Sequence, residues 1–305
     1  MTTSRLLAGI DVGGTKIAAG IVDGDGRILA SRRVPTAPQG GVRVVDQIID
    51  LLRELIPQFA PAPEAVDAIG IAVPAVIDRP GGAVLWAPNI PGWQERVPVA
   101  PPISDALGLP VSLHYDGHAW VMGEWWRGAA RGAQHVALIA VGTGIGGGLL
   151  LGGRLHTGHV GVAGALGWWA LDRQHAGTPS SIRGGLESIA SGPAIARAAG
   201  ADTAEAAFHA AREGDPTART AVANAAHALG LAAADLASLL DPEVIVLAGG
   251  VMTGGADLLL PTIQDLVRRV SQPQVARSVR LVPAELGEDA AWLGAAKLAA
   301  ERADE

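Results

Sequence analysis

Residues 9–16 read Gly-Ile-Asp-Val-Gly-Gly-Thr-Lys and join two apolar segments, 6–10 and 16–22, which are predicted to be strands. Glycine lets the backbone approach a ligand closely, because it lacks a Cβ and tolerates positive φ. Inward-pointing N–H groups of Gly13 and Gly14 and the hydroxyl of Thr15 could then hold phosphate oxygens, beside Lys16. The stretch therefore predicts a phosphate-binding loop, with a plain hairpin turn as the alternative.

Two further glycine clusters follow predicted strands. Residues 142–148 read Gly-Thr-Gly-Ile-Gly-Gly-Gly and follow a strand at 135–141, and Gly249-Gly250 follows a strand at 243–248. A strand, and not a helix, continues from the second cluster at 147–151, which argues against a Rossmann dinucleotide site. The clusters together predict a nucleotide-phosphate site, whose residues in these two loops are Gly142, Thr143, Gly144, Gly249 and Gly250.

Helical and strand patterns alternate along the chain. Helices are predicted at 42–56, 118–127, 216–240 and 289–300, and a further strand at 66–73. After the helix at 118–127 the strand and hairpin signals return, as if the first pattern were repeated. The pattern predicts an α/β protein of two domains, 1–116 and 117–288, with the C-terminal segment 289–305 packing back on the first.

Composition limits the classes of function. Hydrophobic residues make up 49% of the 305 residues, and the formal net charge is -7 with no basic face, so we expect no nucleic-acid partner. The chain has no cysteine, which excludes thiolate zinc ligands. The longest uncharged stretch, 132–153, is interrupted by glycines, and a strand is predicted within five residues of the N-terminus. We therefore expect no membrane span, no signal peptide and a cytoplasmic location.

Four motifs together resemble the ROK family of sugar kinases. They are residues 9–16, the stretch Ala-Pro-Asn-Ile-Pro-Gly-Trp at 87–93, residues 141–148, and Leu-Gly-Ala-Ala at 293–296. The resemblance covers the whole chain. It implies the two-domain actin/hexokinase-like (ribonuclease H-like) fold with an interdomain cleft, the cofactors ATP and Mg²⁺, a sugar-like substrate and a homodimer.

The resemblance also assigns roles to individual residues. Tyr115-Asp116-Gly117-His118 takes the place of the family's Asn-Asp-Ala-Asn motif, so Asp116 is implied as the general base that takes the proton of the acceptor hydroxyl. Taken alone, Asp116 could equally be a helix N-cap. Asp11 is implied to hold Mg²⁺ through water. Asn89 and Glu187 match family positions that bind sugar hydroxyls.

The chain departs from the family in the part that contacts the sugar. Residues 164–168 read Gly-Ala-Leu-Gly-Trp where the family has Gly-Glu-(Ile/Leu)-Gly-His, so Ala165 replaces a glutamate and Trp168 a histidine. Segment 172–185 replaces a cysteine-rich zinc segment, so we expect no zinc. We expect Trp168 and His118 to contact the substrate. Alternatively, Trp168 and Trp169 fill the space left by zinc.

These replacements predict an acceptor other than glucose, such as an amino sugar or a C7-cyclitol. Two other functions stay open, namely an ordinary glucokinase and a non-catalytic sugar- or nucleotide-binding relative. An actin-like assembly protein is disfavoured by the sugar motif at 87–93. His156, His159 and His175 could form a replacement metal site, although their spacing is irregular.

Overall fold

The computed structural model describes residues 5–59, 66–171 and 184–303. The chain divides into two compact units. The first comprises Met1–Arg131, Thr157–Ala163 and Glu288–Glu305, and the second comprises Gly132–His156 and Gly164–Gly287.

The first unit is built on a five-stranded sheet of order β3-β2-β1-β4-β8. β1 pairs antiparallel with β2 and β2 with β3, whereas β4 lies parallel to β1 and β8 parallel to β4. Every residue of β1 except Asp11 is buried, so this strand is a central strand of the unit. The strands are β1 Leu6–Val12, β2 Lys16–Asp23, β3 Ile28–Pro35, β4 Val66–Val73 and β8 Val111–Tyr115.

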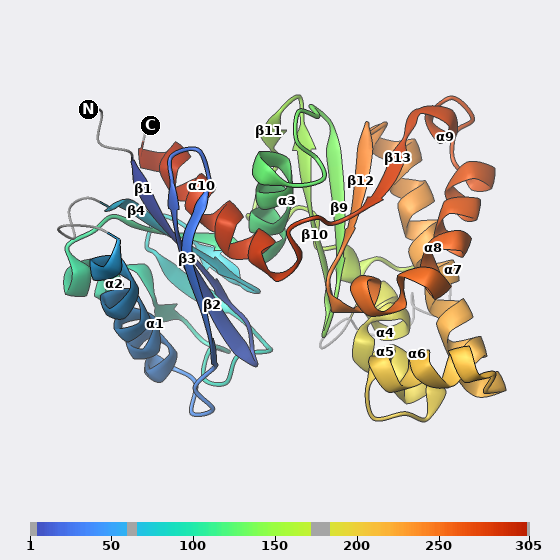
Figure 1. Ribbon diagram of the computed structural model, residues 1–305, viewed down its shortest axis with the longest axis horizontal. Helices are drawn as coiled ribbons and strands as arrows, with labels where there is room; N and C mark the ends of the chain where they lie inside the picture. Colours follow the sequence, from blue (N-terminus) through green and yellow to red (C-terminus); the bar gives the residue numbers. More distant parts are fainter. Residues whose placement is uncertain (1–4, 60–65, 172–183, 304–305) are drawn as a thin grey trace. The chain divides into compact units, whose positions relative to one another are not determined.

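Helices cover both faces of this sheet (Figure 1). α1 (Val42–Leu55) and α2 (Ala100–Leu107) lie on one face, and α3 (Asp116–Arg127) and α10 (Ala290–Ala303) on the other. α10 packs very closely against the sheet and α3. A Cβ on Gly9 would lie 1.9 Å from the Trp292 carbonyl oxygen. The C-terminal helix therefore belongs to the first unit.

The first unit extends past the boundary expected near Asp116. α3 begins at that residue and packs along α10, so the unit continues to Arg131. The change of unit falls in the connection between α3 and the next strand.

A small three-stranded sheet, β5 (Val76–Asp78), β6 (Ala83–Trp86) and β7 (Val97–Pro98), completes the first unit. Its β6–β7 connection contains the motif 87–93. Trp93 is fully buried and its indole N–H donates to the Gly41 carbonyl at 3.0 Å. The Ala87 N–H donates to the Trp93 carbonyl at 2.7 Å, which closes the motif into a compact loop.

The second unit repeats the sheet of the first. Its strand order is β11-β10-β9-β12-β13, with β9, β10 and β11 antiparallel and β12 and β13 parallel to β9. The repeated pattern indicated by the sequence is thus confirmed. The strands are β9 Val136–Val141, β10 Ile145–Leu151, β11 Arg154–Leu155, β12 Val244–Ala248 and β13 Arg280–Pro283.

The helices of the second unit pack around the long, alanine-rich α7. Small side chains allow close helix packing, and Gly230 of α7 faces Leu266 of α8. Among the described helices, α7 is long and apolar enough to cross a membrane, but 61% of its apolar window is buried inside the structure, as in a core helix. The helices are α4 Gly185–Ala190, α5 Gly192–Ala199, α6 Ala204–Glu213, α7 Pro216–Leu240, α8 Gly250–Val270 and α9 Val275–Ser278.

Candidate active site

The first glycine loop is the turn of the β1–β2 hairpin. The Gly13 N–H donates to the Lys16 carbonyl at 2.9 Å, and the Thr36 hydroxyl donates to the Gly13 carbonyl at 2.7 Å. A Cβ on Gly14 would lie 2.4 Å from the Asn89 carbonyl oxygen, so a larger residue would displace the loop 87–93. Thr15 at the tip is exposed. These hydrogen bonds fix the base of the loop and leave its tip accessible.

Two carboxylates lie at the ends of parallel strands beside this loop. Asp11 is near the end of β1, and Asp116 follows β8 directly as the first residue of α3. Because the carboxyl ends of parallel strands meet at one edge of a sheet, the two groups interact. Ligand sites of parallel α/β sheets commonly lie at this edge.

The surroundings shift the pKa of both carboxyl groups upward. Burial first, and then the charge of Asp11, raise the pKa of Asp116 to about 7, and a 2.7 Å hydrogen bond from the Gly117 N–H opposes the shift. Burial also raises the pKa of Asp11 to about 7, with Lys16 opposing the shift and Glu288 adding to it. A carboxyl group that titrates near neutral pH suits proton transfer.

Lys16 is ion-paired with Glu288 in this structure. Glu288 also lies 3.4 Å from the Arg33 guanidinium. The carboxylate thus competes with any phosphate for the Lys16 ammonium. That Lys16 binds phosphate, as the sequence predicts, stays a prediction.

His118 is fully buried in the first turn of α3. Its Nε2 lies 3.0 Å from the Ala163 carbonyl oxygen, and its ring meets the Tyr115 ring edge to face at 5.1 Å. The histidine therefore fixes segment Thr157–Ala163 to the first unit. A direct contact between His118 and a substrate stays a prediction. Asn89, in contrast, is exposed beside Gly14, at the same loop as Thr15.

The second glycine loop is the β9–β10 turn of the second unit. The Gly142 N–H donates to the Gly144 carbonyl at 2.9 Å, and the Gly192 N–H at the start of α5 donates to the Gly142 carbonyl at 2.8 Å. Glu187 of α4 accepts a hydrogen bond from the Ile145 N–H at 2.9 Å. Thr143 is exposed at the tip. Both short helices thus support this loop.

The third glycine pair forms the start of α8. Gly249 has φ of 91°, and a Cβ there would lie 2.3 Å from the Val141 carbonyl oxygen, so the position requires glycine. β9 and β12 are parallel neighbours, and their ends place Gly250 and Gly142 at the same edge of the sheet. The N-terminus of a helix attracts anions through its unpaired N–H groups. The two loops can hold one phosphorylated ligand.

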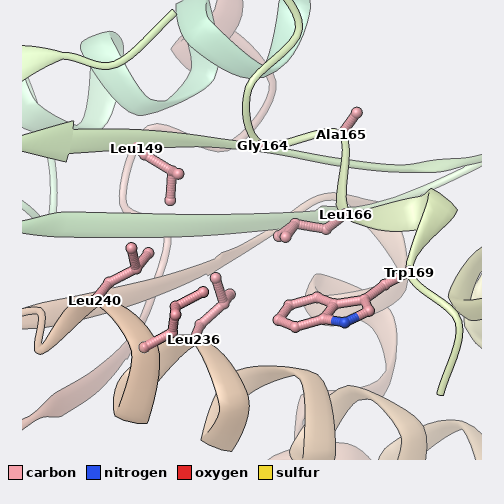
Figure 2. Close-up of a pocket in the computed structure, with 8 residues that line it drawn as sticks. Leu149, Gly164, Ala165, Leu166, Trp169, Leu236 and Leu240 are labelled. Atoms are coloured by element: carbon pink, nitrogen blue, oxygen red, sulfur yellow. The ribbon is translucent and has the colours of Figure 1, made fainter. Parts of the chain in front are cut away.

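The segment that departs from the family contains a short helical turn, Leu166–Trp168. Trp168 is 42% exposed, whereas Trp169 packs against the hydrophobic core of the second unit. That the two tryptophans fill the space left by zinc stays a prediction, because most of the segment 172–185 lies outside the described residues. The Ala165 methyl points away from the surrounding leucines (Figure 2).

Trp169 also lines an apolar pocket of about 270 Å³, which the sequence analysis did not predict. Figure 2 shows Trp169 facing Leu236 and Leu240 of α7, opposite Leu149 of β10. The leucines at 236, 239 and 240 have helical spacing, which indicates an apolar stripe but not what covers it.

Within residues 5–59, 66–171 and 184–303, no group of three or more His, Asp or Glu side chains could hold a metal ion. His175 and most of the segment 172–185 lie outside the described residues, so the proposed histidine cluster is not tested. Proteins commonly hold Mg²⁺ through one or two carboxylates, waters and substrate phosphates, and that Asp11 does so here stays a prediction.

A duplicated sheet with glycine loops in both hairpin turns and an aspartate after the last parallel strand of the first unit defines the actin/hexokinase-like class. Within this class the chain belongs to the ROK family, whose family model matches residues 7–302.

Several of the similar proteins are sugar kinases by name. The chain is 33% identical to a glucokinase of Thermotoga maritima over 97% of this chain and 98% of that protein. It is 33% identical to an N-acetylmannosamine kinase of Citrobacter koseri over 95% and 97% of the two chains. A crystal structure of a ROK glucokinase from Streptomyces griseus with glucose and AMPPNP superimposes with a TM-score of 0.82, at 33% identity over 97% and 99% of the chains.

Proposed function

We propose that this chain transfers the γ-phosphoryl group of ATP to a hydroxyl, most simply a primary one, of a sugar or a sugar-like cyclitol, with Asp116 as general base. The chain is an ATP-dependent carbohydrate kinase, in common with the relatives just described. The identity of the acceptor and the role of Asp116 as the base are the parts of the proposal that the experiment below tests. A homodimer and a cytoplasmic location stay predictions.

The Asp116 carboxyl group carries the proposal. Its pKa of about 7 lets it accept a proton from the acceptor hydroxyl at neutral pH and release it afterwards. As the hydroxyl oxygen bonds to the γ-phosphorus, the bond from that phosphorus to the β–γ bridging oxygen breaks and ADP leaves. The position of Asp116 at the start of a well-packed helix keeps the carboxylate in place.

The donor half of the proposal uses the glycine loops. Thr15 and Thr143, exposed at the loop tips, donate hydroxyl hydrogen bonds to phosphate oxygens, and the start of α8 adds N–H groups. Asp11 is the residue that would hold the hydrated Mg²⁺. Mg²⁺, when bound, neutralises phosphate charge in such reactions.

The proposed acceptor follows from hydrogen-bonding side chains that the family has and this chain lacks. Ala165 offers no hydrogen bond through its side chain, and the exposed Trp168 indole offers one donor and no acceptor. Both features favour an acceptor with fewer hydroxyls on one edge, such as an amino sugar or a C7-cyclitol. The alternative, an ordinary glucokinase, is favoured by the names of the relatives.

The test is release of ADP from Mg-ATP with a panel of glucose, mannose, N-acetylmannosamine, aminoglucoses and C7-cyclitols. Turnover with one acceptor, and its loss in Asp116→Asn, would support both parts of the proposal. The absence of turnover with every acceptor, together with measurable sugar binding, would favour the non-catalytic alternative. Turnover that survives in Asp116→Asn would remove Asp116 as the base and leave the kinase assignment in place.

A further inference from the structure

The first turn of α3 carries a buried histidine close to Asp116. His118 is fully buried there, and its Nε2 lies 3.0 Å from the carbonyl oxygen of Ala163. A carbonyl oxygen only accepts hydrogen bonds, so Nε2 carries the proton and donates it. The bond joins residues that are 45 positions apart in the sequence. Within the first unit, the turn that begins with the proposed base therefore also holds a distant segment of the chain.

The turn that carries His118 is closely packed. The Tyr115 ring meets the His118 ring edge to face, with the two centroids 5.1 Å apart. On the α10 side, a Cβ on Gly294 would lie 1.8 Å from the Ala119 carbonyl oxygen, so the two helices are in backbone contact. Side chains in such close packing stay in one rotamer. The imidazole therefore presents its N–H in a fixed direction.

The segment that His118 binds is a short loop, Thr157–Ala163. The chain enters the first unit at Thr157 and leaves it after Ala163. The Ala163 N–H donates to the Thr157 carbonyl at 3.1 Å, which closes the loop. Residues 158–160 in its middle are all exposed. Because exposed residues add little packing, the position of the loop depends on the bonds at its ends, and the bond from His118 is one of them.

The residue after this loop is fixed to the second unit. Gly164 has a φ of 91°, and a Cβ there would lie 2.5 Å from the Gly147 carbonyl oxygen, so the position requires glycine. The chain thus passes, within one peptide bond, from a residue bonded to α3 to a residue packed on β10. Ala165 and Trp168, which replace the glutamate and histidine of the family, follow directly.

We propose that His118 is a positioning residue for acceptor recognition. Through the Ala163 carbonyl it sets where the chain enters segment 164–168, and with it the place of the side chains proposed to meet the acceptor. This inference rests on the proposed function, which assigns segment 164–168 to the acceptor. The family asparagine at this position is one bond shorter than the path from Cα to imidazole Nε2, so it lacks the reach for this hydrogen bond.

A purely structural role explains the histidine less well. Ala163 is partly exposed, so its carbonyl could bind water without help from a side chain. A polar ring at a fully buried position costs free energy unless it forms a directed hydrogen bond, and an apolar side chain would fill the same space without that cost. The bond that His118 donates is therefore the better reason for a histidine at this position.

The test compares three variants of the full chain. His118→Gln keeps an N–H donor at the same number of bonds from Cα, His118→Asn introduces the shorter family residue, and His118→Leu removes the donor without leaving a buried polar group. Hydrogen exchange of segment Thr157–Ala163, followed by mass spectrometry, should become faster in His118→Asn and His118→Leu. It should stay near the wild-type rate in His118→Gln. Should His118→Asn not fold, His118→Leu still provides the comparison.

Kinetics separate positioning from a structural role. The acceptor is the one with the highest kcat/KM in the panel of sugars and cyclitols. In His118→Asn and His118→Leu its KM should rise roughly two- to tenfold, as for one lost hydrogen bond, while the KM for ATP stays within about twofold. His118→Gln should keep both values near the wild type. The matched control is His227→Gln, at an exposed histidine of α7, which should change neither value.

Three results would overturn the inference. The first is equal hydrogen exchange in the wild type and all His118 variants. The second is faster exchange with both KM values unchanged, which would make His118 structural only. The third is an acceptor KM that rises as much in His118→Gln as in His118→Asn, with exchange unchanged, which would show direct contact with the acceptor. If the wild type turned over no acceptor but the exchange pattern were as expected, the proposed function would be wrong and the anchoring of the loop by His118 would stand.

Discussion

The Glu187 carboxylate accepts a hydrogen bond from the backbone N–H of Ile145 at 2.9 Å, immediately after the second glycine loop. A Cβ on Gly144 would lie 2.7 Å from the same carboxylate oxygen. The family resemblance gives Glu187 a different task, the binding of sugar hydroxyls. The observed contact shows that Glu187 supports the loop proposed to hold the nucleotide, and experiment can separate this role from the predicted binding of sugar.

We expect Glu187→Ala to lower kcat/KM by roughly 10- to 100-fold, because a charge-assisted hydrogen bond worth about 1.5–3 kcal/mol is lost. Support of the loop predicts a rise in KM for ATP. Sugar binding predicts a rise in KM for the acceptor with KM for ATP unchanged. Glu187→Gln retains an oxygen acceptor for the Ile145 N–H. Support of the loop therefore predicts that KM for ATP rises in Glu187→Ala but not in Glu187→Gln, whereas a solely sugar-binding glutamate predicts that it rises in neither variant.

Asp116→Asn is expected to abolish turnover while ATP still binds. A group that transfers the proton contributes roughly 100- to 10,000-fold, and asparagine cannot accept the proton. ADP release measures turnover, and calorimetry measures ATP binding. The control is Asp50→Asn, which removes one exposed carboxylate from α1. Turnover within about tenfold of the wild type would contradict the assignment of the base.

The pH dependence follows from the pKa of Asp116 near 7. The ionised form is the base, so kcat/KM should rise with pH and level off above about pH 7. The folded-state pKa lies above the ordinary value of an aspartate, so this group contributes stability at low pH that is lost as pH rises through about 7. Asp116→Asn should therefore melt higher than the wild type at pH 8, with a smaller difference at pH 5. A rate that is flat between pH 5 and 8 would contradict the prediction.

No zinc is expected to stabilise the protein. A structural zinc site needs about four ligands, and the chain has no cysteine to provide the thiolates of the family. Dialysis against a chelator should leave the Tm within about 1 °C of its starting value. Elemental analysis that finds one zinc per chain, or a marked fall in Tm after dialysis, would show that residues such as His156 and His159 do bind metal.

Local patterns predicted some of the regular elements closely. Strand 66–73 and helix 216–240 coincide with β4 and α7, because each has a strong period and a clear end such as Pro74 or Asp241. The strand predicted at 6–10 continues to Val12, since the pairing with β2 extends to Ile17.

Tertiary contacts determined the rest. The helix α8 was not predicted, because Gly254, Gly255 and Pro261 are residues that disfavour helices and interrupt the spacing of its apolar residues. A Cβ on Gly255 would lie 2.5 Å from the Phe208 ring, so this glycine allows the ring to pack. Among the site residues, the pairing of Lys16 with Glu288 joins residues 272 apart in the chain, which no local pattern can reveal.

The last prediction concerns the acceptor, which we expect not to be glucose. The family glutamate and histidine at the positions of Ala165 and Trp168 bind ring hydroxyls. Each lost hydrogen bond costs about 1 kcal/mol, and more if a buried polar group stays unpaired. Two losses weaken glucose binding by roughly tenfold to a few hundredfold. An acceptor with an amine, a ketone or bare carbon at that edge loses less.

Restoring the family residues provides the decisive measurement. The double variant Ala165→Glu, Trp168→His should raise kcat/KM for glucose by roughly tenfold or more and lower it for the preferred acceptor. Ala170→Glu places a new carboxylate on an exposed neighbouring residue and should change neither value. Because Ala165 is partly exposed and Trp168 is 42% exposed, both positions can accept polar side chains without disturbing the core. If the wild type already preferred glucose over every amino sugar and cyclitol, other residues would have to supply those hydrogen bonds, and our interpretation of Ala165 and Trp168 would be wrong.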